Sequence, residues 1–442
     1  MINRIIKNKL TMRFLLVMLV NVGGIGCGFL LQLYLTNTLD ISTYGSYIYH
    51  MTILNFMVIA VKGGLDLAAN RYIPVFINES DGGRYNAYIR FSTLYVFLSS
   101  LVAIAVCYFL KGIIWSGASS KLYFDLIAVA VSVLAFLQLQ CGFLQAMQQA
   151  VLSQFIQNIL RPLLVFVMTF CWIFYSPELN DYDLLVVVIL VLVLLVIIAN
   201  IFFRIKSKEQ FGKVQEAPIE IRVWLFSAYG MGAVVLFNLV INQFDVLFIG
   251  YYLSSEDAAI YNVALRLASL VQFPAVALGL VLAPQISKLW AEKNVIKIEK
   301  TIHIGAMACL GLSSGLSILI LVKADFLLNL FGSEYIAGRD ALVILCIARC
   351  VNSFGGLAGY LMTMTGYQNI SMKVLLVSAL FSITSNIVLV TNLGPYGGAI
   401  ANLMSTVFWI ILMSVMAVKY LKVSPLFFYR CQSWRRLALW RQ

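Results

Sequence analysis

The stretch "LLVVVILVLVLLVIIANIFF" at residues 184–203 decides the class of this chain, because it contains no charged residue and one amide, Asn200. A helix needs about 20 mostly apolar residues to cross a hydrocarbon core roughly 30 Å thick. The rest of the chain has the same character: 62% of its 442 residues are hydrophobic and 11% are charged. Soluble domains carry about 25% charged residues. The sequence therefore predicts an all-α polytopic membrane protein and excludes a soluble fold.

The same length criterion predicts about twelve membrane-spanning helices, six on each side of a polar interval at 204–222. We expect an N-terminal lobe at 1–203, a cytoplasmic linker at 204–222, a C-terminal lobe at 223–418 and a basic cytoplasmic tail at 419–442. A thirteenth helix stays open. The predicted spans are 14–36, 46–70, 88–110, 124–145, 152–175, 184–203, 223–250, 258–287, 302–322, 341–365, 372–392 and 396–418.

The distribution of charge predicts the orientation in the membrane. The chain carries 31 Lys and Arg residues against 19 Asp and Glu residues, a formal net charge of +12. Most of the basic residues fall in the two tails and in every second loop, whereas the opposite loops hold Lys111, Lys121, Lys323 and Arg339. Cytoplasmic loops are enriched in Lys and Arg, so both termini are expected in the cytoplasm. The basic excess thus indicates topology, and no nucleic-acid partner is predicted.

Motifs for catalysis, metal binding and ATP hydrolysis are missing from the sequence. The eight cysteines lie mostly in apolar runs without C-x-x-C spacing, which indicates packing rather than a zinc site or disulfides. There are two histidines, His50 and His303, and no G-x-x-x-x-G-K-[ST] or H-E-x-x-H motif. Such motifs mark nucleotide hydrolysis and zinc-dependent proteolysis. We therefore predict no cofactor, no metal site and no enzymatic activity.

An internal repeat accompanies the division into two halves. The stretches "TNTLDISTYGSYIY" (36–49) and "GYYLSSEDAAIYNV" (250–263) align at an offset of 214 residues, with Tyr47 opposite Tyr261. Transporters are often built from two repeats, with the substrate site at the interface between them. The repeat therefore favours a transporter made of two parallel six-helix halves.

Several motifs in a fixed order resemble one known family. They are "YGSYIY" (44–49), "DVLFIGYYLSSEDAAIYNVALRLASLVQFPAVALGLVLAPQISKLW" (245–290), "LFGSEYIAGRDALVIL" (330–345), "TGYQN" (365–369) and "NLGPYGGAIANLMSTVFW" (392–409). Together they resemble the polysaccharide-exporter branch of the multidrug/oligosaccharidyl-lipid/polysaccharide (MOP) superfamily, the Wzx-type flippases of O-antigen and other lipid-linked oligosaccharides.

The resemblance implies two six-helix lobes forming a V-shaped bundle, as in multidrug (MATE) transporters of the superfamily. It implies translocation of an undecaprenyl-diphosphate-linked oligosaccharide, such as an O-antigen unit of lipopolysaccharide, from the cytoplasmic to the periplasmic leaflet of a bacterial inner membrane. The expected partners are this anionic substrate, membrane lipids, H+ or Na+ as coupling ion, and polymerase and chain-length proteins of the same pathway. Two alternatives stay open: an ion-coupled multidrug or small-molecule antiporter, and a membrane-bound polysaccharide polymerase or transferase.

Six ionisable residues inside the predicted spans are candidates for function, because a charge at the centre of a membrane helix costs roughly 2.5–3.5 kcal/mol. Arginine and lysine predominate among them, which favours an anionic ligand such as pyrophosphate, whose oxygens Arg can bind in bidentate fashion. The predicted pyrophosphate-binding residues are Arg161, Arg349, Lys62 and Arg266, and the candidates for coupling or gating are Asp66, Asp245 and Asn242.

Each of these residues also has a purely structural interpretation. Lys62 and Asp66 lie four positions apart on one predicted helix and could neutralise one another. Asp245 and Arg266 could form a pair between helices. Arg161 and Arg349 have no acidic residue nearby in the sequence, so they are the preferred ligand residues, although they could instead cap helix carbonyls. The ligand hypothesis fails if every one of these cations is locked against a carboxylate.

Polar residues near Arg161 and, separately, glycines in the first predicted span are further features of the sequence. Gln154, Gln157 and Asn158 lie within two helical turns of Arg161, and the first span contains "NVGGIGCG" at 21–28. Glycines allow membrane helices to approach closely. On the seventh span, Asn238, Asn242 and Asp245 share a face that could hold a cation through oxygen atoms or, more simply, pack against neighbouring helices.

Overall fold

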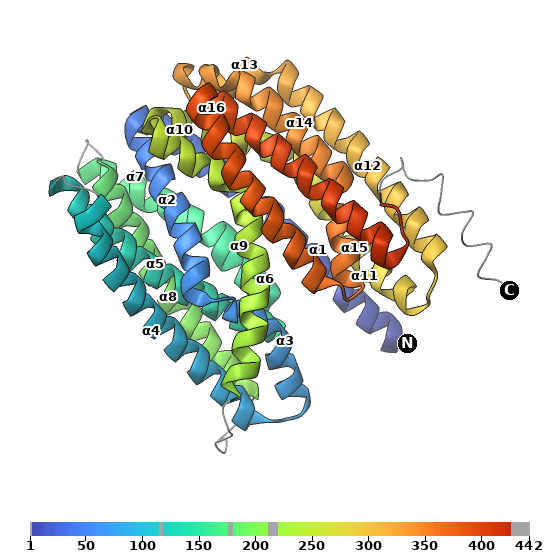
Figure 1. Cartoon of the computed structure of the whole chain (residues 1–442). Helices are drawn as coiled ribbons and strands as arrows, with labels where there is room; N and C mark the ends of the chain where they lie inside the picture. Colours follow the sequence, from blue (N-terminus) through green and yellow to red (C-terminus); the bar gives the residue numbers. More distant parts are fainter. Residues whose placement is uncertain (1, 115–117, 176–179, 211–219, 426–442) are drawn as a thin grey trace. The chain divides into compact units, whose positions relative to one another are not determined.

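A computed structural model of the chain describes residues 2–114, 118–175, 180–210 and 220–425. Every regular element in these ranges is a helix, and eleven helices are long and apolar enough to cross a membrane (Figure 1). The predicted all-α polytopic fold is confirmed. The middle of the linker (211–219) and most of the predicted basic tail lie outside the described residues.

By its internal contacts the chain divides into two compact units, Met1–Leu236 and Phe237–Gln442. The boundary falls inside α9 (Ile221–Tyr252); the lobe boundaries expected around the linker stay a prediction. The first unit also contains α1 (Ile2–Thr38), α2 (Ile41–Lys62), α3 (Leu65–Asn78), α4 (Gly82–Ile114), α5 (Ala118–Ala146), α6 (Ala150–Phe155), the π-helical turn η1 (Ile156–Leu160), α7 (Arg161–Tyr175) and α8 (Asp181–Gln210).

The second unit is built around a long C-terminal helical hairpin. Besides the end of α9 it contains α10 (Ser255–Ser269), the 3-10 turn η2 (Leu270–Gln272), α11 (Phe273–Ala291), α12 (Val295–Val322), α13 (Ala324–Asn329), the 3-10 turn η3 (Ser333–Gly338), α14 (Arg339–Gly355), α15 (Leu357–Met364) and α16 (Gln368–Leu421). α10 begins at Ser255 and α2 begins at Ile41, so the two helices start at the 214-residue offset of the sequence repeat.

The helix α16 consists of two membrane spans, which reconciles eleven helices with twelve predicted spans. Gly394 inside it has non-helical angles (φ 63°, ψ −146°) and is followed by Pro395, which has no N–H to continue the helical bonds. Beyond this break the chain turns back, since the rings of Phe381 and Phe408 stack at 4.4 Å and Figure 1 shows two adjacent rods. Each rod exceeds the about 20 residues that one crossing requires.

A second break corrects the prediction of one continuous span over 46–70. Gly63 (φ 54°) and Gly64 (φ 81°) both adopt left-handed angles, so α2 ends at Lys62 and α3 begins at Leu65. Glycine enters this region at little cost because it has no Cβ. At Gly64 a Cβ would lie 2.2 Å from the carbonyl oxygen of Ala228 in α9. The sequence prediction was wrong here because glycines are common within unbroken membrane helices.

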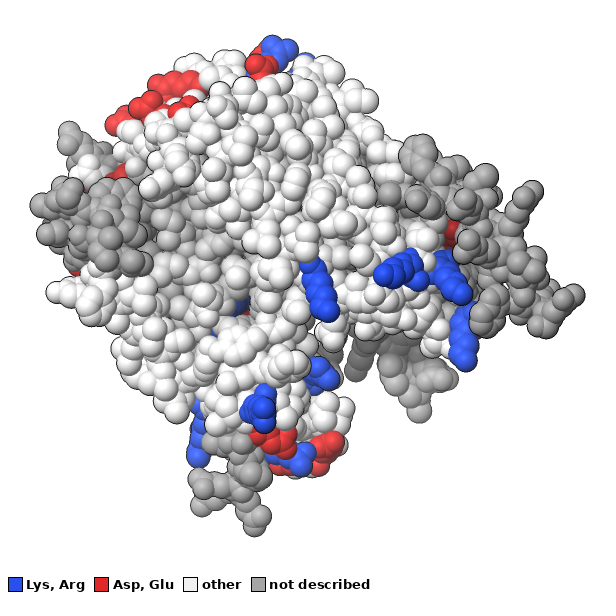
Figure 2. Space-filling model, in the orientation of Figure 1, with Lys and Arg blue, Asp and Glu red and all other residues white. Residues whose placement is uncertain are grey.

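Large apolar side chains cover the outside of the molecule. Phe226 is 86% exposed and Phe174 is 79% exposed, and uncharged residues cover most of the face shown in Figure 2. Lipid tails are as apolar as these side chains, so helix packing depends on close contact between small residues. At Gly142 in α5, for example, a Cβ would lie 2.8 Å from Cβ of Asp66.

We predict that Gly64→Ala destabilises the protein, because left-handed angles cost an alanine roughly 1–2 kcal/mol and the added methyl would overlap the backbone of α9. The matched control is Gly230→Ala, since no atom lies within 4 Å of a Cβ at Gly230 and alanine in a helix interior gains roughly 0.5–1 kcal/mol over glycine. Thermal unfolding in detergent measures both. Equal unfolding temperatures for the two variants would contradict the requirement for glycine at the break.

Candidate functional site

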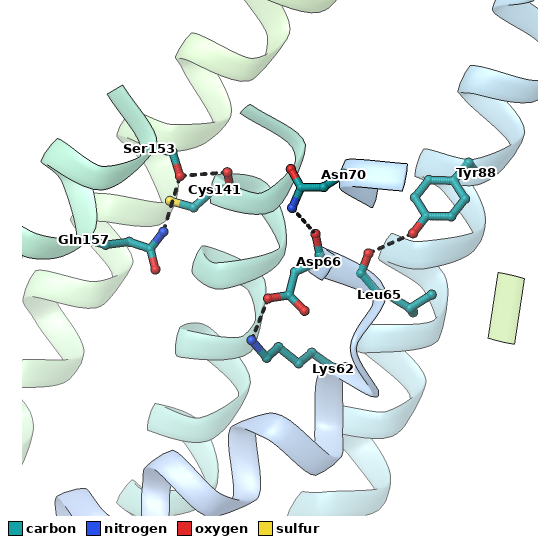
Figure 3. Close-up of polar contacts among 8 residues, drawn as sticks. All are labelled: Lys62, Leu65, Asp66, Asn70, Tyr88, Cys141, Ser153 and Gln157. Carbon is teal, nitrogen blue, oxygen red and sulfur yellow. Dashed lines mark hydrogen bonds and ion pairs between the residues drawn. The ribbon is translucent and has the colours of Figure 1, made fainter. Parts of the chain in front are cut away.

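The first cluster of intramembrane charge lies at the break between α2 and α3 (Figure 3). Nζ of Lys62 is 2.6 Å from Oδ2 of Asp66, and the two side chains are 9% and 11% exposed. The pair joins the end of one helix to the first turn of the next, not one continuous face as the sequence predicted. Oδ1 of Asp66 is buried without a hydrogen-bond partner in the described part of the chain. Lys62 and Asp66 thus neutralise each other in this structure.

Neighbouring side chains satisfy the backbone around this break. The hydroxyl of Tyr88 donates to the carbonyl of Leu65 at 2.8 Å, as Figure 3 shows, and Ser99 Oγ donates to the carbonyl of Val61 at 2.7 Å. A buried carbonyl without a donor is costly, more so where no water is available. Two side chains of α4 therefore satisfy the backbone carbonyls at this break.

We predict that Lys62→Met destabilises the protein by about 3–5 kcal/mol, because it leaves the Asp66 carboxylate buried without a counter-charge. The double variant Lys62→Met/Asp66→Leu should recover most of that loss. The control is Arg339→Met, which breaks an ion pair with Asp325 at 3.2 Å between side chains that are 58% and 56% exposed; such pairs contribute about 0–1 kcal/mol. Thermal unfolding reports all three, and a double variant less stable than Lys62→Met would contradict the pairing.

Arg161 occupies a different environment at the start of α7. Its side chain is half-buried, and it makes no hydrogen bond or ion pair with any residue that the structure describes. Tyr47 of α2 lies within electrostatic range, but no carboxylate accompanies it. Among the candidate cations of the first unit, Arg161 alone keeps an uncompensated charge.

The second cluster lies in the other unit and joins four helices around Asp245, which is 1% exposed. Its carboxylate accepts hydrogen bonds from the hydroxyl of Tyr261 in α10, from Nδ2 of Asn402 in α16 at 2.9 Å and from the Val246 N–H at 2.9 Å. Three donors and no acceptor surround it, which is the arrangement of an ionised carboxylate. The cluster therefore holds a buried negative charge.

Arg349 of α14 supplies the positive charge of this second cluster. It is 4% exposed, and its Nη1 donates to Oδ1 of Asn242 at 2.7 Å, while its Nε is buried without a hydrogen-bond partner among the described residues. Arg349 and Asp245 act on each other electrostatically, although no ion pair within 4 Å joins them in the described chain. Asn242, whose oxygen is taken by the guanidinium, is therefore not open to a cation.

The pair of Asp245 with Arg266 that the sequence suggested is wrong. Arg266 is exposed, and it lies five positions after Tyr261 in α10, so it projects about 140° away around the helix. Sequence analysis also missed the role of Tyr261 and Asn402 as donors to Asp245. The repeat pointed to Tyr261, but no local pattern identifies its partner. Of the six charged candidates, Arg161 and Arg266 thus form no side-chain hydrogen bond or ion pair with a residue that the structure describes.

We predict that Tyr261→Phe lowers the free energy of unfolding by about 1.5–3 kcal/mol, the usual contribution of a hydrogen bond to a charged group. The matched control is Tyr251→Phe, because Tyr251 is 66% exposed and its hydroxyl touches nothing in this cluster. Chemical or thermal unfolding in detergent is the measurement. If the free energy of unfolding falls equally in both variants, this result would argue against an ionised Asp245 in the cluster.

Ionisable residues within membrane spans often mark the pathways of transporters, and comparison with known proteins gives the family of this chain. The model of the family described as "Polysaccharide biosynthesis protein" matches residues 10–290, and the MatE model matches residues 231–388. The first match covers more than half of the chain, so this chain belongs to the polysaccharide biosynthesis protein family. Its predicted place in the MOP superfamily is confirmed.

Two curated relatives are archaeal. The chain is 25% identical over 391 residues to the uncharacterized membrane protein MJ1068 of Methanocaldococcus jannaschii, covering 83% of this chain and 75% of that protein. It is 24% identical over 163 residues to the probable low-salt glycan biosynthesis flippase Agl15 of Haloferax volcanii, covering 36% of this chain and 34% of that protein. The likeness to the flippase thus extends over only a third of either protein.

Two solved structures share the fold. An inward-facing multidrug resistance MATE transporter of the MOP superfamily superposes with a TM-score of 0.71 at 15% identity, covering 93% of this chain and 98% of that one. The lipid II flippase MurJ, in an inward closed conformation, gives a TM-score of 0.71 at 12% identity, covering 92% and 87%. Family and fold together make this protein a MOP-type transporter or flippase.

Proposed function

We propose that the protein flips an undecaprenyl-diphosphate-linked oligosaccharide, an O-antigen or related surface-polysaccharide unit, across a bacterial inner membrane. Translocation would run from the cytoplasmic to the periplasmic leaflet by alternating access, with both termini in the cytoplasm. The observation that carries the proposal is Arg161, a cation within a membrane span that lacks a counter-charge among the described residues. It lies within the part of the chain that matches the polysaccharide biosynthesis family.

An anionic headgroup offsets the cost of such a charge. Arginine inside a membrane span costs roughly 2.5–3.5 kcal/mol, and a diphosphate supplies several oxygens that a guanidinium binds in bidentate fashion. Lys62 and Arg349 are already engaged with Asp66 and Asn242, so they would reach the ligand only after leaving these partners. We therefore assign Arg161 as the main headgroup residue, with Arg349, Lys62 and Arg266 in secondary roles.

The acidic residues of the two clusters are the candidates for energy coupling. Asp66 and Asp245 each lie beside a basic side chain, and Asn242 links Arg349 to α9. Binding of H+ or Na+ at either carboxylate would weaken its electrostatic attraction for the neighbouring basic side chain. Coupling through Asp66 or Asp245, with Asn242 as a gating residue, is part of the proposal.

A multidrug antiporter is the second candidate, because residues 231–388 match the MatE model. Cationic drugs favour acidic sites, whereas the two candidate charges without a side-chain hydrogen bond or ion pair in the described part of the chain belong to Arg161 and Arg266. A polymerase or transferase is the third and weakest candidate, since no catalytic motif appears in the sequence. The sign of the uncompensated charge therefore favours the flippase.

We predict that Arg161→Ala slows flipping about 10- to 100-fold, the equivalent of one lost hydrogen-bonded charge contact. The measurement uses proteoliposomes with a fluorescent undecaprenyl-diphosphate saccharide and a membrane-impermeant quencher. Arg339→Ala is the control, because Arg339 is 58% exposed and pairs with Asp325. A native rate for Arg161→Ala rejects the headgroup assignment, and ion-driven transport of a cationic dye by the wild type favours the antiporter.

A further inference from the structure

The helix that carries Arg161 contains a wide turn that the proposed function does not yet explain. Between α6 and α7, residues Ile156–Leu160 form a π-helical turn, and the N–H of Arg161 donates to the carbonyl of Ile156 five residues earlier. π turns are rare and occur mostly as single turns within α-helices, frequently at functional sites. This one ends at the residue before Arg161.

The cause of the wide turn is Pro162. Proline lacks an N–H, and its ring clashes with the carbonyl four residues earlier in an α-helix, here that of Asn158. Widening by one residue relieves the clash. If the turn relaxed to a regular α-helix, α7 would rotate by about 100° relative to α6 and carry Arg161 with it. The direction in which the guanidinium points therefore depends on the turn.

The first helix holds this turn from one side. Nδ2 of Asn158 donates to Oδ1 of Asn21 in α1 at 2.8 Å and to Oε1 of Gln154 at 2.7 Å. One turn along α1, Gly24 lets the backbones meet: a Cβ there would lie 2.5 Å from Cβ of Asn158 and 2.8 Å from its carbonyl oxygen. The carbonyl of Asn158, which cannot accept a bond from Pro162, thus faces a glycine. Glycine is the one residue type that leaves room for it.

The fifth helix holds the same segment from another direction, as Figure 3 shows. Nε2 of Gln157 donates to Oγ of Ser153 at 3.3 Å, and Oγ of Ser153 donates to the carbonyl of Cys141 at 2.8 Å. Asn158 is therefore bonded directly to α1, and Gln157 is linked to α5 through Ser153 of α6. Side chains thus hold the turn from both sides, whereas the side chain of Arg161 forms no hydrogen bond or ion pair with a described residue.

We infer that Asn158 is a positioning residue for Arg161, and that the notch formed by Asn21 and Gly24 in α1 is its support. The notch fixes the position of the π turn that Pro162 imposes, and this turn aims the guanidinium at an anionic diphosphate headgroup. This inference rests on the proposed function. It makes headgroup affinity depend on a contact between α1 and η1 that touches no ligand.

The test compares Gly24→Ala with Gly26→Ala, in the full-length protein in lipid nanodiscs, by binding of radiolabelled undecaprenyl diphosphate. Gly26 lies in the same helix, but no atom lies within 4 Å of a Cβ at that position. We expect Gly24→Ala to weaken binding about 3- to 10-fold and Gly26→Ala to leave it unchanged. Arg161→Ala alone should weaken binding about 10- to 100-fold.

The double variant Gly24→Ala/Arg161→Ala separates positioning from general damage. If Gly24 acts through Arg161, the double variant binds no more weakly than Arg161→Ala, because effects on one shared contact are not additive. Fully additive losses, or native affinity of a folded Gly24→Ala variant, overturn the inference while leaving the headgroup assignment intact. Native affinity of Arg161→Ala overturns both.

A second route applies if Gly24→Ala unfolds. Asn158→Leu removes the bonds to α1 and Gln154 at similar volume, and Asn386→Leu is its control, since Asn386 is a buried membrane asparagine in the other unit that donates to its own helix. Asn158→Leu should reproduce the loss of affinity, again without further loss in the Arg161→Ala background. Equal affinities for Asn158→Leu and Asn386→Leu would overturn the inference.

Discussion

Hydrocarbon offers no hydrogen bonds, so every polar backbone group and every charge within a membrane span must find its partner inside the protein. This constraint explains why the described chain is helical. It also explains the places where the helices stop. At the α2–α3 break, Tyr88 and Ser99 donate to the carbonyls next to it. At the α6–α7 junction, next to Pro162, the chain widens to a π turn in which the Arg161 N–H donates to the carbonyl of Ile156.

The same constraint organises the charges. Lys62 and Asp66 meet across the glycine break, and Asp245 is surrounded by donors from three elements while Arg349 is held by an amide. Breaking a buried pair by removing one member is costly, so these clusters stabilise each unit in the state described. Arg161 departs from the pattern. It is half-buried and has no carboxylate partner among the described residues, and in the proposed function a ligand brings the negative charge.

The sequence repeat and the charge pattern give the two halves different chemistry. α2 and α10 begin at corresponding positions of the repeat, yet Asp245, offset by 214 residues, corresponds to Leu31 in the first half. The first unit places its buried acid, Asp66, in the first turn of α3, and the second places its buried acid, Asp245, in α9.

Sequence alone determined the membrane class, the helix count and the family, because each depends on runs of apolar residues or on ordered motifs that need no knowledge of contacts. It also singled out six ionisable residues within the predicted spans. It did not determine their partners. Arg349 and Asn242 are 107 residues apart, and Asn402 and Asp245 are 157 apart. Only packing brings such side chains together.

Of the two breaks in the helices, the sequence predicted one and missed the other. Gly394–Pro395 was predictable, since proline interrupts a helix by itself, and the spans on either side were separated correctly. Gly63–Gly64 was not, because a glycine pair is compatible with an unbroken helix until α9 approaches within 2.2 Å of the position a Cβ would take. Tertiary contact decided that break, and with it the pairing of Lys62 with Asp66 across two helices, because only the close approach of a neighbouring backbone requires glycine at that point.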